Sequence, residues 1–408
     1  MPESPYPMIS VDEAINLVLA NVAPLPPVQQ RFDEAQGWVL AEEIVASEPL
    51  PPFPASTVDG FAVVAADGAA ERLLVGEQFA GYDAALHVEP GQAARITTGA
   101  PVPAGADAVM MVEWSREENG RVRFSRAVES GAYVRPIGSD IRAGQRVLEA
   151  GQPLGPAEIG LLATVGAATV SLYPPPIIGV MSTGDELVAP DQTPGPGQIR
   201  DSNRFSLMAA VREAGAEPLD LGIAPDTWDA LLAFIEVGLQ RYDAMVTSGG
   251  VSMGELDLVK PLLEQRGTIH FGRVNFKPGK PATFGTLGGK PFFALPGNPV
   301  SSLVSFEVFV RPALQKMRGL PPLHWHRPCV PALLDHPVRH TPSRTEYQRA
   351  ILRFDPADGR FHVSTTGSQE SSRLLSMLGA NALIILPHGM GDFQAGDTIE
   401  ALVLGALA

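Results

Sequence analysis

Short apolar runs alternate with helical patterns between residues 177 and 322 of this 408-residue chain. The runs IIGVM, EPLDLGI and DAMVT are rich in apolar or β-branched residues, as buried strands are. Apolar residues recur at helical spacing over residues 202–214 and 227–239, and again from Glu255 onward. Strands that alternate with helices predict an α/β fold with a doubly wound domain, in which a parallel sheet carries helices on both faces.

The pattern changes on both sides of this region. A capping box formed by Ser10 and Glu13 predicts a helix through Ala20. Residues 49–54 are rich in proline and indicate a stiff hinge. Short alternating strands with frequent glycines follow this hinge, and short strands return near the end of the chain. The expected division is residues 1–26 as an N-terminal helix joining the doubly wound region, 27–48 with 146–176 as a connecting helix and strand domain, 49–145 as a mostly β domain, 177–322 as the doubly wound domain and 323–408 as a C-terminal β barrel.

Polar groups gather on the loops that follow the predicted strands. Ligands of open parallel sheets bind beyond the carboxyl ends of the strands, so these loops are expected to meet at one edge of the sheet. The loops are residues 182–187, 223–226, 248–257, 276–281 and 294–301.

A glycine-rich turn stands out among these loops. Ser248, Gly249 and Gly250 follow the strand DAMVT, and the glycines allow a sharp turn and close approach of a ligand. A strand that leads through such a turn into a helix N-terminus is typical of anion sites. Asp257 in the first helical turn is suited to cap the helix or to hold a metal ion, although a turn of this kind can also be a simple connector.

The other candidate groups on these loops suit phosphate chemistry. Carboxylates bind Mg²⁺ or act as general bases, and lysines hold oxyanions as point charges. Asp226 is equally well placed to cap the following helix, and Glu186 to be a solvated residue of a first turn. A lysine-bearing turn has little structural purpose, which favours a binding role for it. The carboxylates are Glu186, Asp226 and Asp257, the lysines are Lys277 and Lys280, and the neutral donors are Ser248, Ser252 and Ser301.

Composition excludes several classes of function. The formal net charge of −15 at pH 7 argues against a general nucleic-acid or anionic-membrane surface. The single cysteine, Cys329, allows neither a disulfide framework nor a thiolate zinc site, and is expected to be inert. Prolines 174–176 interrupt the uncharged run 159–184, so no membrane span is expected. The absence of Lys and Arg from the first 30 residues argues against a signal peptide and favours a cytoplasmic protein.

Six motifs together resemble one known family. STVDGFAV, TTGAPVPAGADAV, STGDEL, TSGGVSMGELD, FKPGKP and LPGNPVSS occur in the order typical of the molybdopterin molybdenumtransferases, the MoeA-type proteins to which the gephyrin E-domain is similar. The resemblance covers nearly the whole chain. It implies a homodimer of elongated four-domain subunits, with residues 1–26 also at the dimer contact. It also implies an enzyme that takes adenylylated molybdopterin and molybdate, inserts the metal at the dithiolene, and cleaves the pyrophosphate linkage with Mg²⁺ to release molybdenum cofactor and AMP.

The resemblance also implies the roles of individual residues. It assigns Asp257, Asp226 and Glu186 to the active site, with Asp257 and Glu186 holding the metal. It further implies that Asp59 and Thr98 are supplied by the partner subunit, whereas the residues alone favour ordinary turns in those two loops. The residues implied to bind the substrates are Ser248, Gly249, Gly250, Ser252, Lys277, Lys280, Pro296, Gly297, Asn298, Pro299, Ser301, Arg344 and Ser371.

Two other functions remain to be weighed. A molybdopterin adenylyltransferase shares the doubly wound domain, but such a single-domain relative does not need the Asp59 and Thr98 loops or residues 323–408. A non-catalytic scaffold is the other alternative, because the gephyrin relative also organises receptors, although nothing in this chain resembles a receptor-docking adaptor. Small-molecule substrates and transient contacts with other cofactor-biosynthesis proteins are expected, without nucleic acid or membrane partners.

Overall fold

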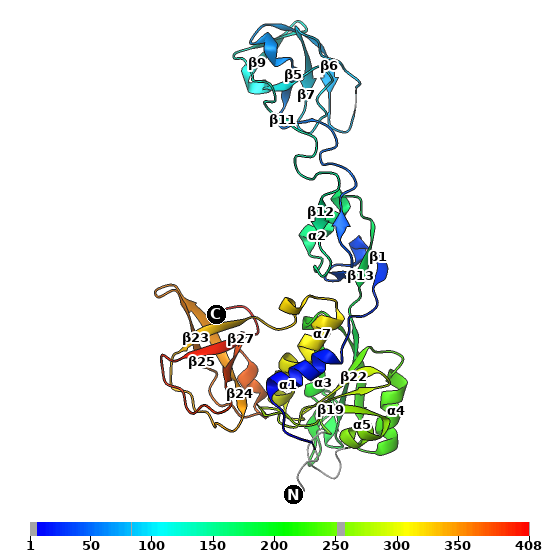
Figure 1. Cartoon of the computed structure of the whole chain (residues 1–408), viewed down its shortest axis with the longest axis vertical. Coiled ribbons are helices and arrows are strands. Elements are labelled where there is room, and N and C mark those ends of the chain that lie inside the picture. Colours follow the sequence, from blue (N-terminus) through cyan, green and yellow to red (C-terminus); the bar gives the residue numbers. More distant parts are fainter. Residues whose placement is uncertain (1–5, 83, 251–257, 408) are drawn as a thin grey trace.

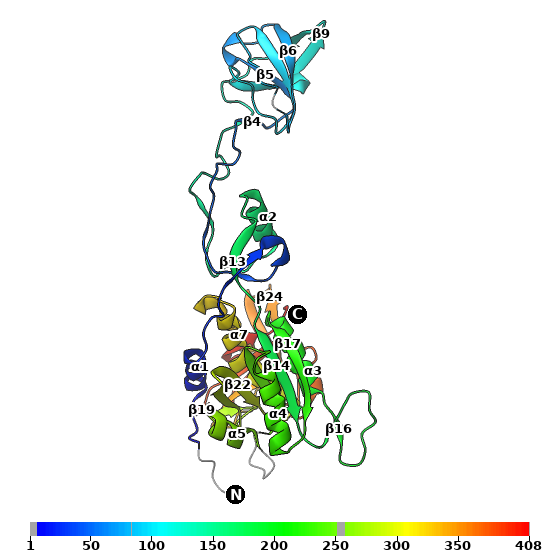
Figure 2. The same ribbon diagram turned by 90° about the vertical axis from the view of Figure 1, so that its right-hand side faces the viewer.

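The computed structural model describes residues 6–82, 84–250 and 258–407. The molecule is elongated: a β domain lies at one end, a small connecting domain follows, and a central α/β domain lies beside a C-terminal β domain at the other end (Figure 1). A view at right angles shows the same separation of the two ends (Figure 2). No helix in the described part of the chain is long and apolar enough to cross a membrane.

The sheet of the central domain has six strands in the order β17-β14-β18-β22-β21-β19. The first four strands are parallel, as expected, but β21 and β19 are antiparallel to their neighbours. The reason is that only Gly288 and Gly289 separate β21 from β22, and a two-residue turn can join only antiparallel strands. The strands are β14 (Ile177–Thr183), β17 (Glu217–Ala224), β18 (Ala244–Ser248), β19 (Gly267–Phe271), β21 (Thr283–Leu287) and β22 (Lys290–Leu295), with the small parallel pair β15 (Leu187–Val188) and β16 (Ile199–Arg200) beside them.

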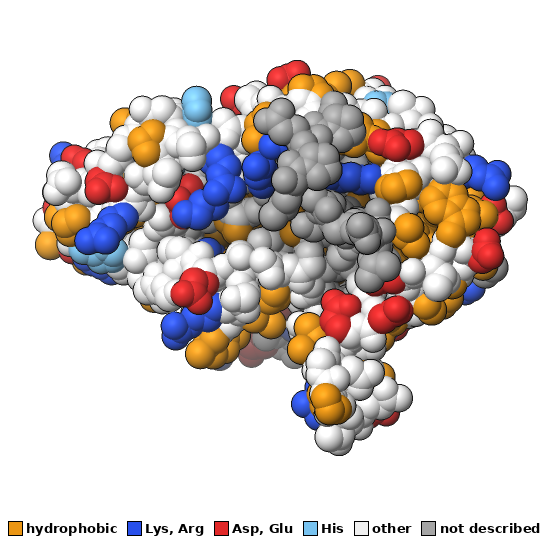
Figure 3. Space-filling view, turned by 90° about the horizontal axis from the view of Figure 1, so that it is seen from below, with side chains coloured by type: hydrophobic (Ala, Val, Ile, Leu, Met, Phe, Trp, Pro, Cys, Tyr) orange, Lys and Arg blue, Asp and Glu red, His pale blue; other side chains and the backbone are white. Residues whose placement is uncertain are grey.

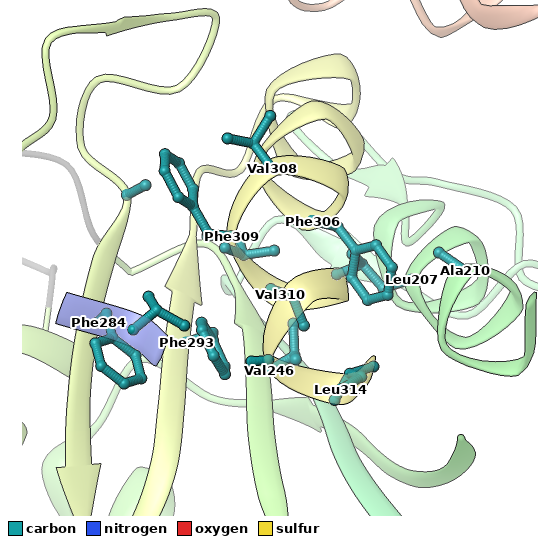
Figure 4. Packing of buried hydrophobic residues seen from close by; sticks show 14 of the residues in the cluster. Leu207, Ala210, Val246, Phe284, Phe293, Phe306, Val308, Phe309, Val310 and Leu314 are labelled. Atoms are coloured by element: carbon teal, nitrogen blue, oxygen red, sulfur yellow. The ribbon is translucent and has the colours of Figure 1, made fainter. Parts of the chain in front are cut away.

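Helices cover both faces of this sheet, because neighbouring residues of a strand point to opposite faces. Val246 of β18 packs with one set of helices, and the preceding Met245 packs with the other. On the Val246 face, Phe309 and Leu314 belong to the same buried cluster as Phe293 (Figure 4). That face carries α3 (Asn203–Glu213), α6 (Pro299–Ser305), the π-helix η4 (Phe306–Val310) and α7 (Arg311–Met317), and the other carries α4 (Trp228–Gly238) and α5 (Val259–Arg266).

The helix expected from Glu255 onward is described from Val259. Leu258 occupies its N-cap position, and Val259, Leu262 and Leu263 are buried as their spacing predicts. The expected opening at Glu255 lies outside the described residues.

The N-terminal helix α1 (Val11–Ala20) packs onto the central domain. The Ser10 side chain caps it by accepting a hydrogen bond from the backbone N–H of Glu13 at 3.1 Å, as the capping box predicts. Val11, Ala14 and Val18 are buried in the same core as η4 and α7.

The C-terminal domain is a closed five-stranded barrel, in which β24 pairs with both β25 and β26. A short strand of the central domain, β20 (Phe276–Lys277), pairs with β24 and ties the two domains together. The barrel strands are β23 (Cys329–Leu334), β24 (Thr345–Asp355), β25 (Arg360–Thr365), β26 (Ala382–Leu386) and β27 (Thr398–Val403), with the short helices η5 (Pro322–His324) and η6 (Leu374–Met377).

The remaining two domains are small. The connecting domain consists of β1 (Val28–Arg31), η1 (Phe32–Glu34), β2 (Val39–Leu40), β3 (Ile44–Val45), β12 (Arg146–Leu148), α2 (Pro156–Thr164) and β13 (Thr169–Tyr173). The distal domain is a six-stranded sheet in the order β8-β5-β7-β6-β10-β9 with a small pair, β4 and β11, beside it. Its elements are β4 (Ala55–Ser56), β5 (Gly60–Val63), η2 (Ala65–Asp67), β6 (Arg72–Gln78), β7 (Gln92–Ile96), β8 (Ala108–Met111), η3 (Val112–Trp114), β9 (Ser115–Glu118), β10 (Arg121–Phe124) and β11 (Val134–Arg135).

Candidate functional site

The glycine-rich turn after β18 requires both of its described glycines. Gly249 has φ +95° and Gly250 has φ +69°, a region that other residues rarely adopt. A Cβ on Gly249 would lie 2.6 Å from the carbonyl oxygen of Thr183, and one on Gly250 would lie 2.8 Å from Cγ2 of Val259. The turn therefore passes tightly between the end of β14 and the start of α5.

A small pocket of about 280 Å³ lies over the carboxyl ends of β14, β18 and β22. Asn203, at the start of α3, links two of the loops that line the pocket. The Asn203 Nδ2 donates to Ser248 Oγ at 2.8 Å and to the carbonyl oxygen of Gly297 at 2.6 Å. The sequence reasoning missed Asn203, although the polar run Asp201-Ser202-Asn203 before a helix was an available signal. The lining includes Ser182, Thr183, Glu186, Asn203, Ser248, Gly249, Gly297, Asn298 and Pro299.

A buried charge network adjoins this pocket, and its members Ser182 and Asp201 line it. Ser182 Oγ donates to Asp201 Oδ1 at 2.9 Å, and Arg204 Nε donates to Asp201 Oδ2 at 2.8 Å. Arg204 also pairs with Asp220 of β17. Burial works to lower the pKa of Arg204, but its bonds to Asp201 and Asp220 outweigh burial and raise it. The start of α3 is thereby held against the sheet.

Two acidic loops meet beside the pocket. The backbone N–H of Asp226 donates to Asp185 Oδ1 at 3.2 Å, which brings the loop after β17 to the loop after β14. The N-cap position of α4 is Thr227, so Asp226 does not occupy it. Glu186 is exposed, and its carboxylate lies where a Cβ on Gly184 would project.

A larger pocket of about 660 Å³ adjoins the first one and extends to the barrel. Asn298 and Ser372 line both pockets, and Asn298 Nδ2 donates to Ser371 Oγ at 3.0 Å across the domain boundary. In the described part of the chain, no hydrogen bond or ion pair reaches the ammonium of Lys280 or the guanidinium of Arg344. The lining includes Lys277, Lys280, Pro296, Asn298, Ser301, Arg344 and Ser371.

Arg344 is held in place through its backbone. Its carbonyl oxygen lies 2.9 Å from Nε2 of the buried His340, whose Nδ1 lies 2.9 Å from the carbonyl oxygen of Met390. Lys and Arg side chains gather near the middle of the molecular face drawn in Figure 3. The larger pocket thus offers unpaired positive charge on a chain whose net charge is negative.

Lys277 differs from Lys280 in having a structural partner. Its ammonium lies 3.0 Å from Oε1 of Glu346, whose side chain is only 4% exposed. The sequence reasoning that a lysine-bearing turn has little structural purpose is therefore wrong for Lys277, because Glu346 needs a counter-charge.

Of the expected metal pair, Glu186 is described, whereas Asp257 lies outside the described residues. The predicted neutral donor Ser252 lies outside them as well. Among described residues, the one close group of three potential metal ligands is Asp355, Asp358 and His362, on the β24–β25 turn of the barrel. At the edge of the small pocket, exposed Glu186 supplies a single carboxylate. That fits Mg²⁺, which is commonly bound by one or two carboxylates together with substrate phosphates.

Asp59 and Thr98 contact each other in the distal domain. The backbone N–H and Oγ1 of Thr98 both donate to Asp59 Oδ1, at 2.7 and 2.9 Å. These bonds, the backbone one first, lower the pKa of Asp59. The distal domain lies at the other end of the molecule from the central domain, with the connecting domain between them (Figure 1). Within one chain, the fold does not bring this pair to the central loops.

Comparisons with known proteins cover almost the whole chain. The family described as MoeA N-terminal region (domain I and II) matches residues 9–166, the probable molybdopterin binding domain matches 179–316, and the MoeA C-terminal region (domain IV) matches 331–404. Molybdopterin molybdenumtransferase 1 of Mycobacterium tuberculosis is 36% identical over 424 residues, with 97% of this chain and 99% of that protein covered.

Two further proteins are similar. Gephyrin of Dictyostelium discoideum is 37% identical over 455 residues; 99% of this chain is covered, but the chain spans only 63% of gephyrin's length. A crystal structure of the molybdopterin biosynthesis MoeA protein from Pyrococcus horikoshii has a TM-score of 0.84 at 29% identity, with 98% of this chain and 100% of that chain covered.

Proposed function

Because the chain belongs to the molybdopterin molybdenumtransferase family, we propose that it inserts molybdate into adenylylated molybdopterin during molybdenum cofactor biosynthesis. The insertion is accompanied by cleavage of the pyrophosphate linkage, so that molybdenum cofactor and AMP leave the enzyme. The curated relatives of full length are named for molybdenum transfer, which supports the general reaction.

The observation that carries this proposal is the pair of adjoining pockets. One is lined mainly by hydroxyl and amide groups, and the other contains Lys280 and Arg344 without partners among the described residues. A substrate that joins a polar organic part to an oxyanion fits such a pair. Lys280 and Arg344 would hold molybdate by charge, with Ser301 and Ser371 as neutral donors.

We propose that Mg²⁺ binds at the acidic loops. Glu186, together with Asp257, would hold the ion next to the pyrophosphate. The bound ion would supply neutralisation of the charge on the phosphate oxygens. Asp226 lies on the loop that meets the Glu186 loop through Asp185, which is consistent with a supporting role at the same edge.

We propose that a second subunit supplies Asp59 and Thr98 of its distal domain to the site. The distal domain, which carries Asp59 and Thr98, lies on the far side of the connecting domain from the central domain (Figure 2). If they belong to the active site, a two-fold partner is the economical way to bring them there. We therefore propose a homodimer in which each site combines central loops of one chain with the distal loops of the other.

The decisive experiment follows AMP release from adenylylated molybdopterin by the purified full chain, with Mg²⁺ and with or without molybdate. Molybdate-dependent AMP release is the expected result. Formation of adenylylated molybdopterin from ATP would instead support an adenylyltransferase. A protein that binds neither molybdate nor the adenylylated substrate would support a scaffold.

A further inference from the structure

His340 lies between two backbone carbonyl groups. It is 6% exposed, and it precedes the short segment that leads to Arg344 and β24. Its Nδ1 lies 2.9 Å from the carbonyl oxygen of Met390, and its Nε2 lies 2.9 Å from that of Arg344. A ring turned over would put carbon atoms at these positions, and C–H···O contacts are longer, about 3.3–3.6 Å. Both ring nitrogens therefore face the carbonyl oxygens.

These two carbonyl oxygens are satisfied together only by a ring that donates twice. A carbonyl oxygen only accepts, and a neutral imidazole carries one N–H, so its second nitrogen would turn a lone pair toward the other oxygen. Within the described residues, no other hydrogen bond reaches the carbonyl oxygen of Met390 or that of Arg344. The imidazolium, with an N–H on each nitrogen, is the form that fits this geometry.

The surroundings of the ring suit a positive charge. His340 lines a polar pocket of about 460 Å³ in the barrel, which is large enough to hold water. Asp392 lines it as well, and its Oδ1 accepts a hydrogen bond from the backbone N–H of His340 at 2.7 Å. The other charged groups there are exposed Arg339, whose charge water screens, and the pair of Lys277 with Glu346. Because this pair offsets itself, the carboxylate of Asp392 is left to stabilise the imidazolium.

The ring joins Arg344 to the loop between β26 and β27. Met390 belongs to that loop, and the backbone N–H of the neighbouring Gly389 donates to the carbonyl oxygen of Pro342 at 2.8 Å. Arg344 lines the larger pocket, where no hydrogen bond or ion pair of the described residues holds its guanidinium. The position of the Arg344 backbone therefore decides where this guanidinium can lie.

We propose that His340 is a positioning residue that carries a proton on both ring nitrogens at neutral pH and thereby holds Arg344 beside the oxyanion in the larger pocket. The inference rests on the proposed function, in which Arg344 binds molybdate. Loss of one ring proton breaks one of the two bonds, loosens the backbone of Arg344 and weakens oxyanion binding. Molybdate affinity therefore falls as the pH rises and His340 becomes neutral.

The first test is calorimetric titration of the full chain with molybdate at about pH 6 and about pH 8.5, because histidine is the side chain that ordinarily changes charge near this range. Cys329 stays neutral there, since burial raises the pKa of its thiol to about 11. The wild type should bind molybdate about fivefold more weakly at the higher pH, as expected for one lost hydrogen bond. An affinity that is the same at both pH values would overturn the proposal.

Two substitutions separate the charge of His340 from its packing. His340→Lys keeps a positive charge and can donate to both carbonyl oxygens, so it should bind molybdate at both pH values as tightly as the wild type does at the lower one. His340→Gln, which is neutral, should bind about fivefold more weakly at the lower pH and show no pH dependence. His388→Gln is the matched control, because His388 is an exposed histidine on the loop that carries Met390, and it should keep the wild-type pH profile. Wild-type pH dependence in His340→Lys would contradict the assignment to His340.

Arg344→Ala tests whether His340 acts through Arg344. This variant should bind molybdate weakly, and adding His340→Gln to it should cause no further loss, because the positioned group is already absent. A further loss of about fivefold in the double variant would show that His340 acts by another route, and would overturn the positioning role.

The protonation of the ring can be observed without molybdate. In ¹⁵N NMR spectra of the wild type at about pH 7, both ring nitrogens of His340 should be protonated, whereas an unperturbed histidine is mostly neutral there. The His340 signals are assigned by their absence from His340→Gln or His340→Lys. A ring with a single N–H would overturn the proposal, whatever the variants do to folding.

The outcomes separate this inference from the proposed function. Molybdate binding that is independent of pH, by a chain with normal AMP release, overturns the inference and leaves the proposed reaction intact. His340-dependent molybdate binding by a chain that releases no AMP supports the inference and refutes the proposed reaction. Absence of molybdate binding at both pH values overturns the inference together with the proposed role of Arg344.

Discussion

The ammonium of Lys277 lies 3.0 Å from Oε1 of Glu346, which joins the central domain to the barrel at the point where β20 pairs with β24. The Glu346 side chain is 4% exposed, whereas that of Lys277 is 38% exposed. A buried carboxylate needs a counter-charge, so Lys277 combines a structural contact with a place in the larger pocket.

Lys277 and Lys280 are therefore expected to respond differently to substitution. Lys277→Ala should lower the free energy of unfolding by about 2 kcal/mol, because it leaves Glu346 unpaired, with solvent at Lys277 limiting the effect. Lys280→Ala should change it by less than about 0.5 kcal/mol. Both should weaken molybdate binding. Urea unfolding measures the stabilities, and titration with molybdate measures the binding. The double variant Lys277→Ala/Glu346→Gln should be more stable than Lys277→Ala, because it no longer contains an unpaired carboxylate. Equal stability of the two single variants would contradict the assignment.

Mixing of subunits tests the shared active site. Asp59→Asn and Asp257→Ala should each be inactive as homodimers. A heterodimer of the two would contain one site with both changes and one with neither, so about half of the wild-type AMP release per heterodimer is expected. Mass spectrometry should establish that heterodimers form. If they form and remain inactive, each chain builds its own site.

Substitution of the carboxylates tests the proposed Mg²⁺ site. Asp257→Ala should abolish AMP release, and Glu186→Gln should reduce it and raise the Mg²⁺ concentration required, because each removes an oxygen ligand. Glu186→Gln should leave folding unaffected, since Glu186 is exposed. Glu217→Gln is the matched control and should be fully active. Glu217 begins β17, so it lies at the amino-terminal ends of the parallel strands, away from the loops of the proposed site. AMP release that does not respond to Mg²⁺ in any variant would refute the site.

A buried ion-pair network beneath the domain boundary gives a pH-dependent prediction. Burial tends to raise the pKa of Glu307, but its bonds to Arg311 and Arg327 lower the pKa below the usual value of 4.5. A carboxyl with a lowered pKa contributes stability above pH 4.5, and this contribution is lost as the pH falls through the folded-state pKa. Glu307→Gln should therefore cost about 3 kcal/mol at pH 7, with the difference from wild type shrinking below pH 4.5.

Unfolding by urea at pH 7 and at pH 3.5 measures this difference. Glu71→Gln is the control, because Glu71 forms exposed pairs with Arg121 and Arg123, which water screens, and should change stability much less. A Glu307→Gln difference that is constant with pH would mean that the network does not stabilise the charged carboxylate.

Much of the local structure follows from the sequence. The capping box at Ser10, the strands around Val246 and the tight glycine turn after Ser248 could all be predicted, because each depends on residues near one another in the chain. The hairpin at Gly288 and Gly289 also had a local signal, a pair of glycines between apolar runs, which the alternation of strands and helices obscured.

By itself, the sequence determined that the loops after the central strands meet at one edge, because the parallel strands that carry most of them end on the same side of a sheet. Which groups become partners was decided only by tertiary structure. Nothing near Lys277 in the sequence marks Glu346 as its counter-charge, and nothing near Asn203 shows that its Nδ2 is used and its Oδ1 is not. Such pairings join residues far apart in the chain, and they depend on how whole domains pack, which no local pattern encodes.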